Sequence, residues 1–211
     1  MLVDIFTIFP EMFDGPFSYG VMKIAKEKGM ADIRIWDLRD FTDDPHHKVD
    51  DYPYGGGPGM VLMAEPIFKG VRSVKDDNAK VILLSPQGKL YTQSVAQKLA
   101  KEKHLIFICG RYQGVDERVR ERLVDIELSI GDYVLAGGEL ASMVIIESIV
   151  RLLPGVVGNF ESISSDSVES FDPPLYTRPR EIDGMSVPET LFSGNHKKIK
   201  EWCDGRREKW E

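Results

Sequence analysis

The residues with the clearest chemical potential lie in glycine-rich segments that follow short apolar runs. Three such segments occupy residues 83–88, 108–116 and 129–139. In an open parallel sheet, ligands bind just outside the carboxyl ends of the strands, where segments of this kind meet. One such segment alone is most often a tight turn, but three in succession predict a single binding site.

A further cluster, residues 54–60, reads Tyr-Gly-Gly-Gly-Pro-Gly-Met. Consecutive glycines are poor in regular structure because each has much backbone freedom to lose on folding. The cluster is either a floppy loop or a backbone that must approach a ligand closely, and the sequence leaves both readings open.

The composition of the three segments limits the ligand. Neither the phosphate-binding pattern that ends in Gly-Lys-Ser/Thr nor the dinucleotide pattern Gly-x-Gly-x-x-Gly is present. Apart from Arg111 the segments carry few positive charges, which disfavours a pyrophosphate. We therefore predict a mainly neutral, nucleoside-type cofactor with an adenine held between apolar backbone segments, and not a triphosphate.

These segments need a sheet that holds them at one edge. Runs rich in Val, Ile and Phe predict buried strands at residues 3–9, 33–36, 81–84, 105–109 and 124–129. Helical periodicity predicts helices at residues 17–28, 66–74, 94–103 and 138–153, the third capped by Thr92 and the fourth stopped by Pro154 and Gly155. Strands that alternate with helices indicate an α/β fold with a parallel sheet covered on both faces.

Composition narrows the class of protein. The chain has 211 residues, 42% hydrophobic and 29% charged, which is ordinary for a soluble globular domain. The longest mainly apolar stretch, residues 143–157, is broken by two charges and a proline, short of the roughly 20 residues of a membrane span. The first residues do not form a signal peptide, and two cysteines without clustered histidines indicate neither a disulfide framework nor a zinc site. We expect a cytoplasmic protein without a membrane partner.

The chain changes character after residue 158. Between Arg151 and Arg178 there is no Lys or Arg, and residues 161–172 are acidic and serine-rich without any helical or strand period. We expect a domain at residues 1–158, a flexible acidic linker at 159–172 and a small C-terminal domain at 173–211.

Six motifs in order give the chain a resemblance to a known family. They are Gly-Gly-Gly-Pro-Gly-Met at 55–60, Leu-Ser-Pro-Gln-Gly at 84–88, Gly-Arg-Tyr-Gln-Gly-Val-Asp-Glu-Arg at 110–118, Ser-Ile-Gly-Asp-Tyr-Val-Leu-x-Gly-Gly-Glu at 129–139, Pro-x-x-Tyr-Thr-Arg-Pro at 173–179 and Ser-Gly-Asn-His at 193–196. The chain resembles the bacterial tRNA (guanine-N1)-methyltransferases of the TrmD family, from its first expected strand to the neighbourhood of Trp202.

The resemblance implies features that spacing does not show. It implies a knotted (SPOUT-class) α/β methyltransferase with a deep trefoil knot at the cofactor segments, a rare exception to ordinary topology. A small, mainly helical C-terminal domain that binds tRNA is expected to follow. The implied cofactor is S-adenosylmethionine, with Mg²⁺ as an additional cofactor, and the implied assembly is a homodimer with shared active sites. The implied product is N1-methylguanosine just 3′ of the anticodon.

Methylation of guanine N1 needs a base for the N1 proton and a cation for the charge that spreads to O6. By resemblance, Asp166 in the acidic linker is the general base, although a free Asp has a pKa of only about 3.9. By resemblance, Arg151 is the cation over O6. From the residues alone, Asp166 would be a solvated linker carboxylate and Arg151 a cation favoured at a helix C-terminus.

The resemblance also assigns binding residues. The cofactor is expected to contact Leu84, Ser85, Pro86, Gly110, Ile130, Gly131, Asp132, Tyr133, Val134, Leu135, Gly137 and Gly138. Contacts to RNA are expected from Arg111, Tyr112, Tyr176, Arg178 and His196, with Lys197 and Lys198 as further candidates. For each lysine alone a solvated surface charge is the more common role.

Two departures from the family pattern affect these expectations. Many relatives have Glu where this chain has Gln113, which puts the assignment of a magnesium site in doubt. Relatives usually continue some tens of residues beyond the point that matches Trp202, whereas this chain ends at Glu211. The alternatives left open are a knotted methyltransferase with another RNA target and a non-catalytic RNA-binding factor.

The net charge, 27 − 34 = −7, disfavours a nucleic-acid partner when it is taken as a total. The local distribution changes that reading. Positive charge gathers at Arg178, Arg180 and residues 196–211, where six Lys/Arg face four Asp/Glu. We therefore expect binding to tRNA that weakens with salt.

Overall fold

The computed structural model describes residues 1–157 and 173–206. The chain divides into two compact units, Met1–Gly158 and Asn159–Glu211, and each is described by itself. No helix in the described ranges combines the length and apolar character that crossing a membrane requires.

The first unit is built on a five-stranded sheet in the order β2-β1-β6-β5-β7. All neighbouring pairs of this sheet are parallel. The strands are β1 (Leu2–Thr7), β2 (Asp32–Asp37), β5 (Ala79–Leu90), β6 (His104–Cys109) and β7 (Ile126–Ser129). The predicted parallel α/β sheet is therefore confirmed, with each predicted strand present.

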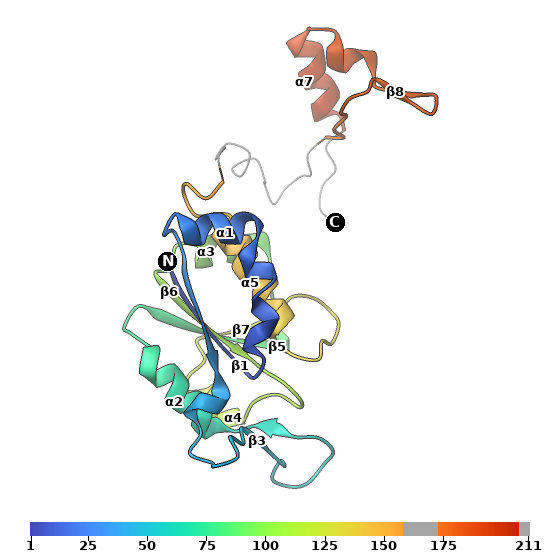
Figure 1. Ribbon diagram of the computed structural model, residues 1–211. Coiled ribbons are helices and arrows are strands. Elements are labelled where there is room, and N and C mark those ends of the chain that lie inside the picture. Colours follow the sequence, from blue (N-terminus) through green and yellow to red (C-terminus); the bar gives the residue numbers. More distant parts are fainter. Residues whose placement is uncertain (158–172, 207–211) are drawn as a thin grey trace. The chain divides into compact units, whose positions relative to one another are not determined.

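Helices cover both faces of this sheet (Figure 1). They are α1 (Gly20–Glu27), α2 (Ala64–Val74), α3 (Gln93–Leu99), α4 (Glu117–Arg122) and α5 (Glu139–Val150). Side chains of α1, α3 and α5 pack in one apolar core, and side chains of α2 and α4 pack in the other. Alternate residues of each strand serve the two cores: in β6, Phe107 belongs to the first and Ile106 and Ile108 to the second.

Short elements complete this unit. The 3-10 helices are η1 (Pro10–Phe13), η2 (Pro16–Ser18) and η3 (Leu38–Phe41), and the two-residue strands β3 (Asp50–Asp51) and β4 (Val61–Leu62) pair antiparallel. The predicted helix at 17–28 thus begins as η2 and continues as α1. The predicted strand at 3–9 ends at Thr7, whose Oγ1 accepts a hydrogen bond from the Phe9 backbone N at 3.0 Å.

The predicted helix at 94–103 is wrong at its C-terminal end, because the observed helix ends four residues earlier, at Leu99. Helix α3 stops at Leu99 because the chain tightens there: Lys101 N donates to Lys98 O, and Glu102 N donates to Leu99 O. The predicted cap is also different. Thr92 occupies the N-cap position, but its hydroxyl makes no capping hydrogen bond and instead lies 2.9 Å from Ser94 Oγ.

Strand β5 runs further than predicted and pairs with β7 in two registers. Leu84 is paired with Leu128, and after a shift Lys89 is paired with the same Leu128. Residues 85–88 therefore arch past β7. Gly88 lies so close that an added Cβ would be 2.5–2.7 Å from backbone atoms of Leu128.

A buried polar cluster ties the strands together away from the glycine-rich segments. The Asp4 carboxylate, fully buried in β1, accepts hydrogen bonds from Arg34 at 2.7 and 2.8 Å and from Trp36 Nε1 at 2.6 Å. His104 Nε2 lies 2.7 Å from Asp4 Oδ2. The hydrogen bond to Asp4 is the largest cause that raises the pKa of Arg34. This cluster joins β1, β2 and β6.

In the second unit, the described part contains a hairpin as well as helix. Strands β8 (Glu181–Ile182) and β9 (Met185–Ser186) pair antiparallel, followed by the 3-10 helix η4 (Glu189–Phe192) and helix α7 (His196–Asp204). The hairpin adds to the predicted mainly helical domain. Its turn is Asp183-Gly184, both at positive φ (52° and 77°), which is a strong hairpin signal in sequence.

Candidate functional site

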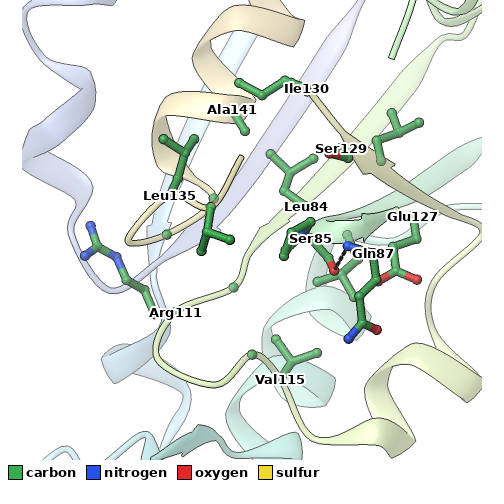
Figure 2. A pocket seen from close by; sticks show the side chains of 18 of the residues that line it. Leu84, Ser85, Gln87, Arg111, Val115, Glu127, Ser129, Ile130, Leu135 and Ala141 are labelled. Carbon is green, nitrogen blue, oxygen red and sulfur yellow. Dashed lines mark hydrogen bonds between the residues drawn. The ribbon is translucent and has the colours of Figure 1, made fainter. Parts of the chain in front are cut away.

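The three glycine-rich segments meet around one cavity of about 410 Å³. Two of them follow the ends of β6 and β7, and the third, residues 83–88, includes the part of β5 where its register on β7 shifts; β5 lies between β6 and β7 in the sheet. Figure 2 shows labelled side chains from these three segments and from α5 around the same space. The prediction that the segments converge at the carboxyl edge of a parallel sheet is confirmed, and the volume lies within the ordinary range for a small-molecule site.

The centre of the cavity is apolar. Leu84, Ile130, Leu135 and Ala141 contribute to its lining (Figure 2). Gly138 brings two segments into contact, because its N–H donates to Gly110 O at 2.9 Å. A Cβ on Gly138 would be 2.9 Å from the Cα of Cys109 and 3.1 Å from the Cβ of Leu84. Only glycine at position 138 therefore allows the two segments to approach closely enough to form this part of the cavity wall.

Two arginines line the cavity, and each is paired with a carboxylate. Arg111 Nε lies 3.1 Å from Oε2 of the buried Glu139. Thr7 donates from Oγ1 to the other oxygen of Glu139 at 2.8 Å, and the Arg111 guanidinium lies over the Phe9 ring, 4.5 Å from its centroid. Burial, then the Glu139 charge, raises the pKa of the Cys109 thiol beneath this pair. The thiol is thus held protonated.

The second arginine lies in another polar part of the lining. Arg120, on α4, donates from Nε and Nη2 to Glu127 Oε2, both at 2.8 Å. Its Nη2 also lies 3.1 Å from Gln87 Oε1. These three residues line the cavity and were missed by the sequence analysis. Gln87 belongs to the Leu-Ser-Pro-Gln-Gly motif, but no motif marks Arg120 or Glu127, and the three are brought together from β5, α4 and β7.

The fourth glycine cluster does not line this cavity. Gly55, Gly56, Gly57 and Gly59 all have positive φ, between 78° and 127°, a conformation that L-residues rarely adopt. A Cβ on Gly59 would be 2.9 Å from the side chain of Gln113. The glycines of residues 54–60 are therefore required by the loop's own turns and by its packing on the 110–114 segment.

Comparison with known proteins decides the family. The family described as "tRNA (Guanine-1)-methyltransferase TrmD" matches residues 1–210 of this chain. The chain belongs to the TrmD family. A tRNA (guanine-N(1)-)-methyltransferase from Dictyoglomus turgidum is 54% identical over 202 residues, which are 95% of this chain and 82% of that relative. The corresponding protein from Geobacillus kaustophilus is 55% identical over 206 residues, 96% of this chain and 84% of the relative.

Membership of the TrmD family gives the activity. The chain is a tRNA (guanine-N1)-methyltransferase, its substrate class is tRNA, and S-adenosylmethionine is the methyl donor that the family implies. The two alternatives that the sequence left open, another RNA target and a non-catalytic factor, are set aside by the same finding.

The structure gathers the cofactor residues that the TrmD family predicts. All of them line the cavity except Asp132. Of the predicted RNA contacts, Arg111 and Tyr112 also line it, and Tyr112 has a φ of 59°. The cavity thus places the predicted cofactor residues beside two of the predicted RNA contacts.

The two predicted catalytic residues are not gathered in the same way. Asp166 lies outside the residues that the structure describes. Arg151 follows the last residue of α5 as its C-cap, its N–H bonded to Glu147 O at 3.1 Å, and it does not line the cavity. The helix predicted at 138–153 therefore ends three residues earlier than predicted, at Val150.

The remaining predicted RNA contacts of this TrmD-family chain lie in the second unit. The Tyr176 ring packs edge-on against Trp202 with centroids 6.2 Å apart. His196 begins α7, whose N-cap Asn195 accepts a hydrogen bond from Lys198 N at 3.1 Å. Arg178 precedes a cis peptide bond to Pro179.

Potential metal ligands do not gather in the part of the chain that the structure describes. Residues 1–157 and 173–206 contain no group of three or more His, Cys, Asp or Glu side chains that could hold a metal ion.

Proposed function

We propose that this chain transfers a methyl group from S-adenosylmethionine to N1 of the guanine just 3′ of the anticodon, with Asp166 as general base and Arg151 stabilising charge on O6. The observation that carries the proposal is the cavity formed by the glycine-rich segments of β5 and of the ends of β6 and β7, in a chain of the TrmD family. We place the reaction in the cytoplasm, where tRNA is available.

The residues of the cavity fit S-adenosylmethionine. Apolar side chains of Leu84, Ile130 and Leu135 suit an adenine ring, and the strand-end segments offer backbone donors and acceptors for its edge. Both lining arginines are already neutralised, Arg111 by Glu139 and Arg120 by Glu127. A triphosphate would find no unpaired cation among them, which supports a ligand without phosphates.

The chemistry on the tRNA side needs a proton acceptor and a cation. When bound, S-adenosylmethionine supplies the methyl group, and its carbon–sulfur bond breaks as the bond to N1 forms. The Asp166 carboxylate takes the N1 proton, which makes the ring nitrogen nucleophilic; a positioned base contributes roughly 10²–10⁴ in rate. The Arg151 guanidinium donates to O6, where negative charge develops.

We further propose that the active site is shared in a homodimer. Helix α5 touches the cavity near its start, at Gly138 and Ala141, and its 12 residues span about 18 Å. Arg151, at the far end, is therefore remote from the cavity of its own chain. A second copy would bring an Arg151 to that cavity.

The surface of α5 supports the same arrangement. Leu140 and Val144 are 52% and 51% exposed, and Glu147 and Arg151 continue this stripe at helical spacing. Beside the stripe lies an apolar hollow lined by residues of η2, α1 and α5, including Phe17, Met22 and Met143. Packing of a second copy on this stripe would cover the exposed apolar side chains.

The backbone crossings at the cavity support a trefoil knot. The arch of residues 85–88 past Leu128 and the contact of Gly138 with Cys109 are the close passages that a threaded chain needs. We accordingly assign residues 1–158 to cofactor binding and residues 173–211 to tRNA binding, joined by 159–172. Mg²⁺ remains a prediction from the family; Gln113 supplies no charge for it.

The first experiment measures methyl transfer from labelled S-adenosylmethionine to tRNA. Wild-type protein is expected to methylate a transcript with guanine 3′ of the anticodon and to leave the same transcript with adenine there unmodified. Asp166→Asn and Arg151→Met are expected to lose roughly 10²-fold or more in turnover while retaining S-adenosylhomocysteine binding. Full turnover by Asp166→Asn would refute its role as base.

A second experiment tests the shared site. Arg151→Met is mixed, with subunit exchange, with Ser85→Trp, which is designed to block the cavity. Neither variant alone is expected to turn over. If Arg151 comes from the other subunit, one site in each mixed dimer is intact, and random pairing restores about a quarter of wild-type activity. No recovery in a demonstrated mixed dimer would place Arg151 in its own chain's site.

A further inference from the structure

A polar cluster in the wall of the cavity takes no part in the proposed proton transfer or in charge stabilisation at O6. Gln87 comes from β5, Arg120 from α4 and Glu127 from β7, and all three line the cavity. In Figure 2 the Gln87 and Glu127 side chains lie side by side, across the cavity from Arg111. Three elements distant in sequence thus contribute one hydrogen-bonded group.

Arg120 determines which atoms the other two residues can offer. A guanidinium has donors only, so the Gln87 atom that faces Arg120 Nη2 at 3.1 Å must be the amide oxygen. The Gln87 amide is therefore not free to flip, and its NH₂ group is turned away from Arg120. Without Arg120 either orientation of the amide would be open.

The same arginine occupies one oxygen of Glu127. Arg120 Nε and Nη2 both lie 2.8 Å from Glu127 Oε2, and the side chain of Glu127 is only 18% exposed. The second oxygen, Oε1, keeps its acceptor capacity for another partner. Arg120 is held in turn by Glu117, whose Oε2 is 3.5 Å from Nη1. The cluster therefore presents a donor from Gln87 next to an acceptor from Glu127.

A donor next to a carboxylate acceptor suits a pair of neighbouring hydroxyls. One hydroxyl donates to the carboxylate and the other accepts from the amide, and acidic side chains bind ribose hydroxyls in this way in other nucleotide sites. We propose that Arg120 is a positioning residue, which fixes Gln87 and Glu127 as the pair that holds the ribose hydroxyls of the methyl donor. This inference rests on the proposed role of the cavity as the donor site.

The test measures binding of S-adenosylhomocysteine and of its 2′-deoxy and 3′-deoxy analogues by calorimetry. The variant is Arg120→Met, and the control is Arg118→Met, which removes a 68% exposed arginine of the same helix that does not line the cavity. Arg120→Met is expected to bind S-adenosylhomocysteine roughly tenfold more weakly than wild type. Its binding of each deoxy analogue is expected to weaken by only about threefold, because one of the two hydroxyl contacts is already missing and only the other can still be lost.

A merely structural role of Arg120 would weaken all three ligands alike, and that result would overturn the proposal, as would unchanged binding of S-adenosylhomocysteine. Circular dichroism establishes whether each variant is folded. If Arg120→Met does not fold, Arg120→Lys, which keeps the positive charge, replaces it in the same binding experiment. If wild-type protein bound no S-adenosylhomocysteine, the proposed function of the cavity would fail instead. In turnover, Arg120→Met is expected to raise KM for S-adenosylmethionine and leave kcat near wild type.

Discussion

Replacement of Gly88 by alanine tests the passage of β5 past β7. The added Cβ would be 2.5 Å from the carbonyl carbon of Leu128, 2.6 Å from its N and 2.7 Å from its Cα. Ordinary contact begins near 3.4 Å, so one backbone must move by 3.4 − 2.5 = 0.9 Å. Neither can move freely, because Leu84 and Lys89 both pair with Leu128. Overpacking of this kind costs about 1–3 kcal/mol, a factor of roughly 5 to 150 in the folding equilibrium.

The assay is urea unfolding followed by circular dichroism, with S-adenosylhomocysteine binding measured in parallel. Gly88→Ala is expected to lower the free energy of unfolding by about 1–3 kcal/mol and to weaken binding, because Ser85, Pro86 and Gln87 of the same arch line the cavity. The matched control is Gly15→Ala. Gly15 has a helical φ of −67° and no atom within 4 Å of an added Cβ, so its variant should stay within about 0.5 kcal/mol of wild type. Equal stability of the two variants would refute the close passage.

Three further changes have expected outcomes in the same unfolding assay. Thr7→Val removes the hydroxyl that donates to the buried Glu139 carboxylate and should lower the free energy of unfolding by about 1.5–3 kcal/mol. Asp4→Asn leaves donors of the buried polar cluster without a full acceptor set and should lower it by about 1–3 kcal/mol. Burial is the main cause that raises the pKa of Tyr91, which is hydrogen-bonded to Ser148 at 2.6 Å. Tyr91 therefore contributes stability that is complete below about pH 10 and lost as the pH rises through its raised pKa, and Tyr91→Phe should flatten that alkaline decline.

A control variant checks the first of these changes, and a contradicting outcome can be named for each of the other two. Thr7→Ser keeps the hydroxyl and should cost only about 0.8–1 kcal/mol for the lost methyl group; a larger loss than for Thr7→Val would contradict the reasoning. For Asp4→Asn, an unchanged urea midpoint would show that the carboxylate is not needed by its donors. For Tyr91→Phe, the difference in urea midpoint between the variant and wild type should change between pH 8 and about pH 11. The same difference at both pH values would contradict the raised pKa of Tyr91.

The centre of the sheet was predictable because β1, β6 and the first half of β5 are largely runs of Val, Ile, Leu and Phe, as expected for strands buried on both faces. The continuation of β5 was not, because Pro86 and Gly88 normally end a strand. In the structure Pro86 lies in the arch between the two registers, where no ladder bond to β7 is required of it. Pro86 and Gly88, which would normally indicate the end of a strand, therefore mark an irregularity inside one.

The candidate site likewise contains residues that the sequence marks and residues that it does not. Its glycines and apolar residues occur in local motifs, so the sequence and the family resemblance were enough to pick out residues that the structure places around one cavity. Arg120 and Glu127 are, in sequence, ordinary charged residues of a helix and a strand, and their convergence with Gln87 is set by how β5, α4 and β7 pack. The Asp183-Gly184 turn was overlooked although its local signal is strong.

The glycine and main-chain lining of the cavity has a consequence for inhibitors. A compound that fills the space between the three segments contacts atoms that point mutation cannot remove, and a larger residue at Gly138 would collide with Cys109 of the same chain. The side chains that mutation could alter without such a collision include Leu84, Ile130, Leu135 and Ala141. Each of them also shapes the room for the natural ligand, so target-site resistance would carry a cost in fitness.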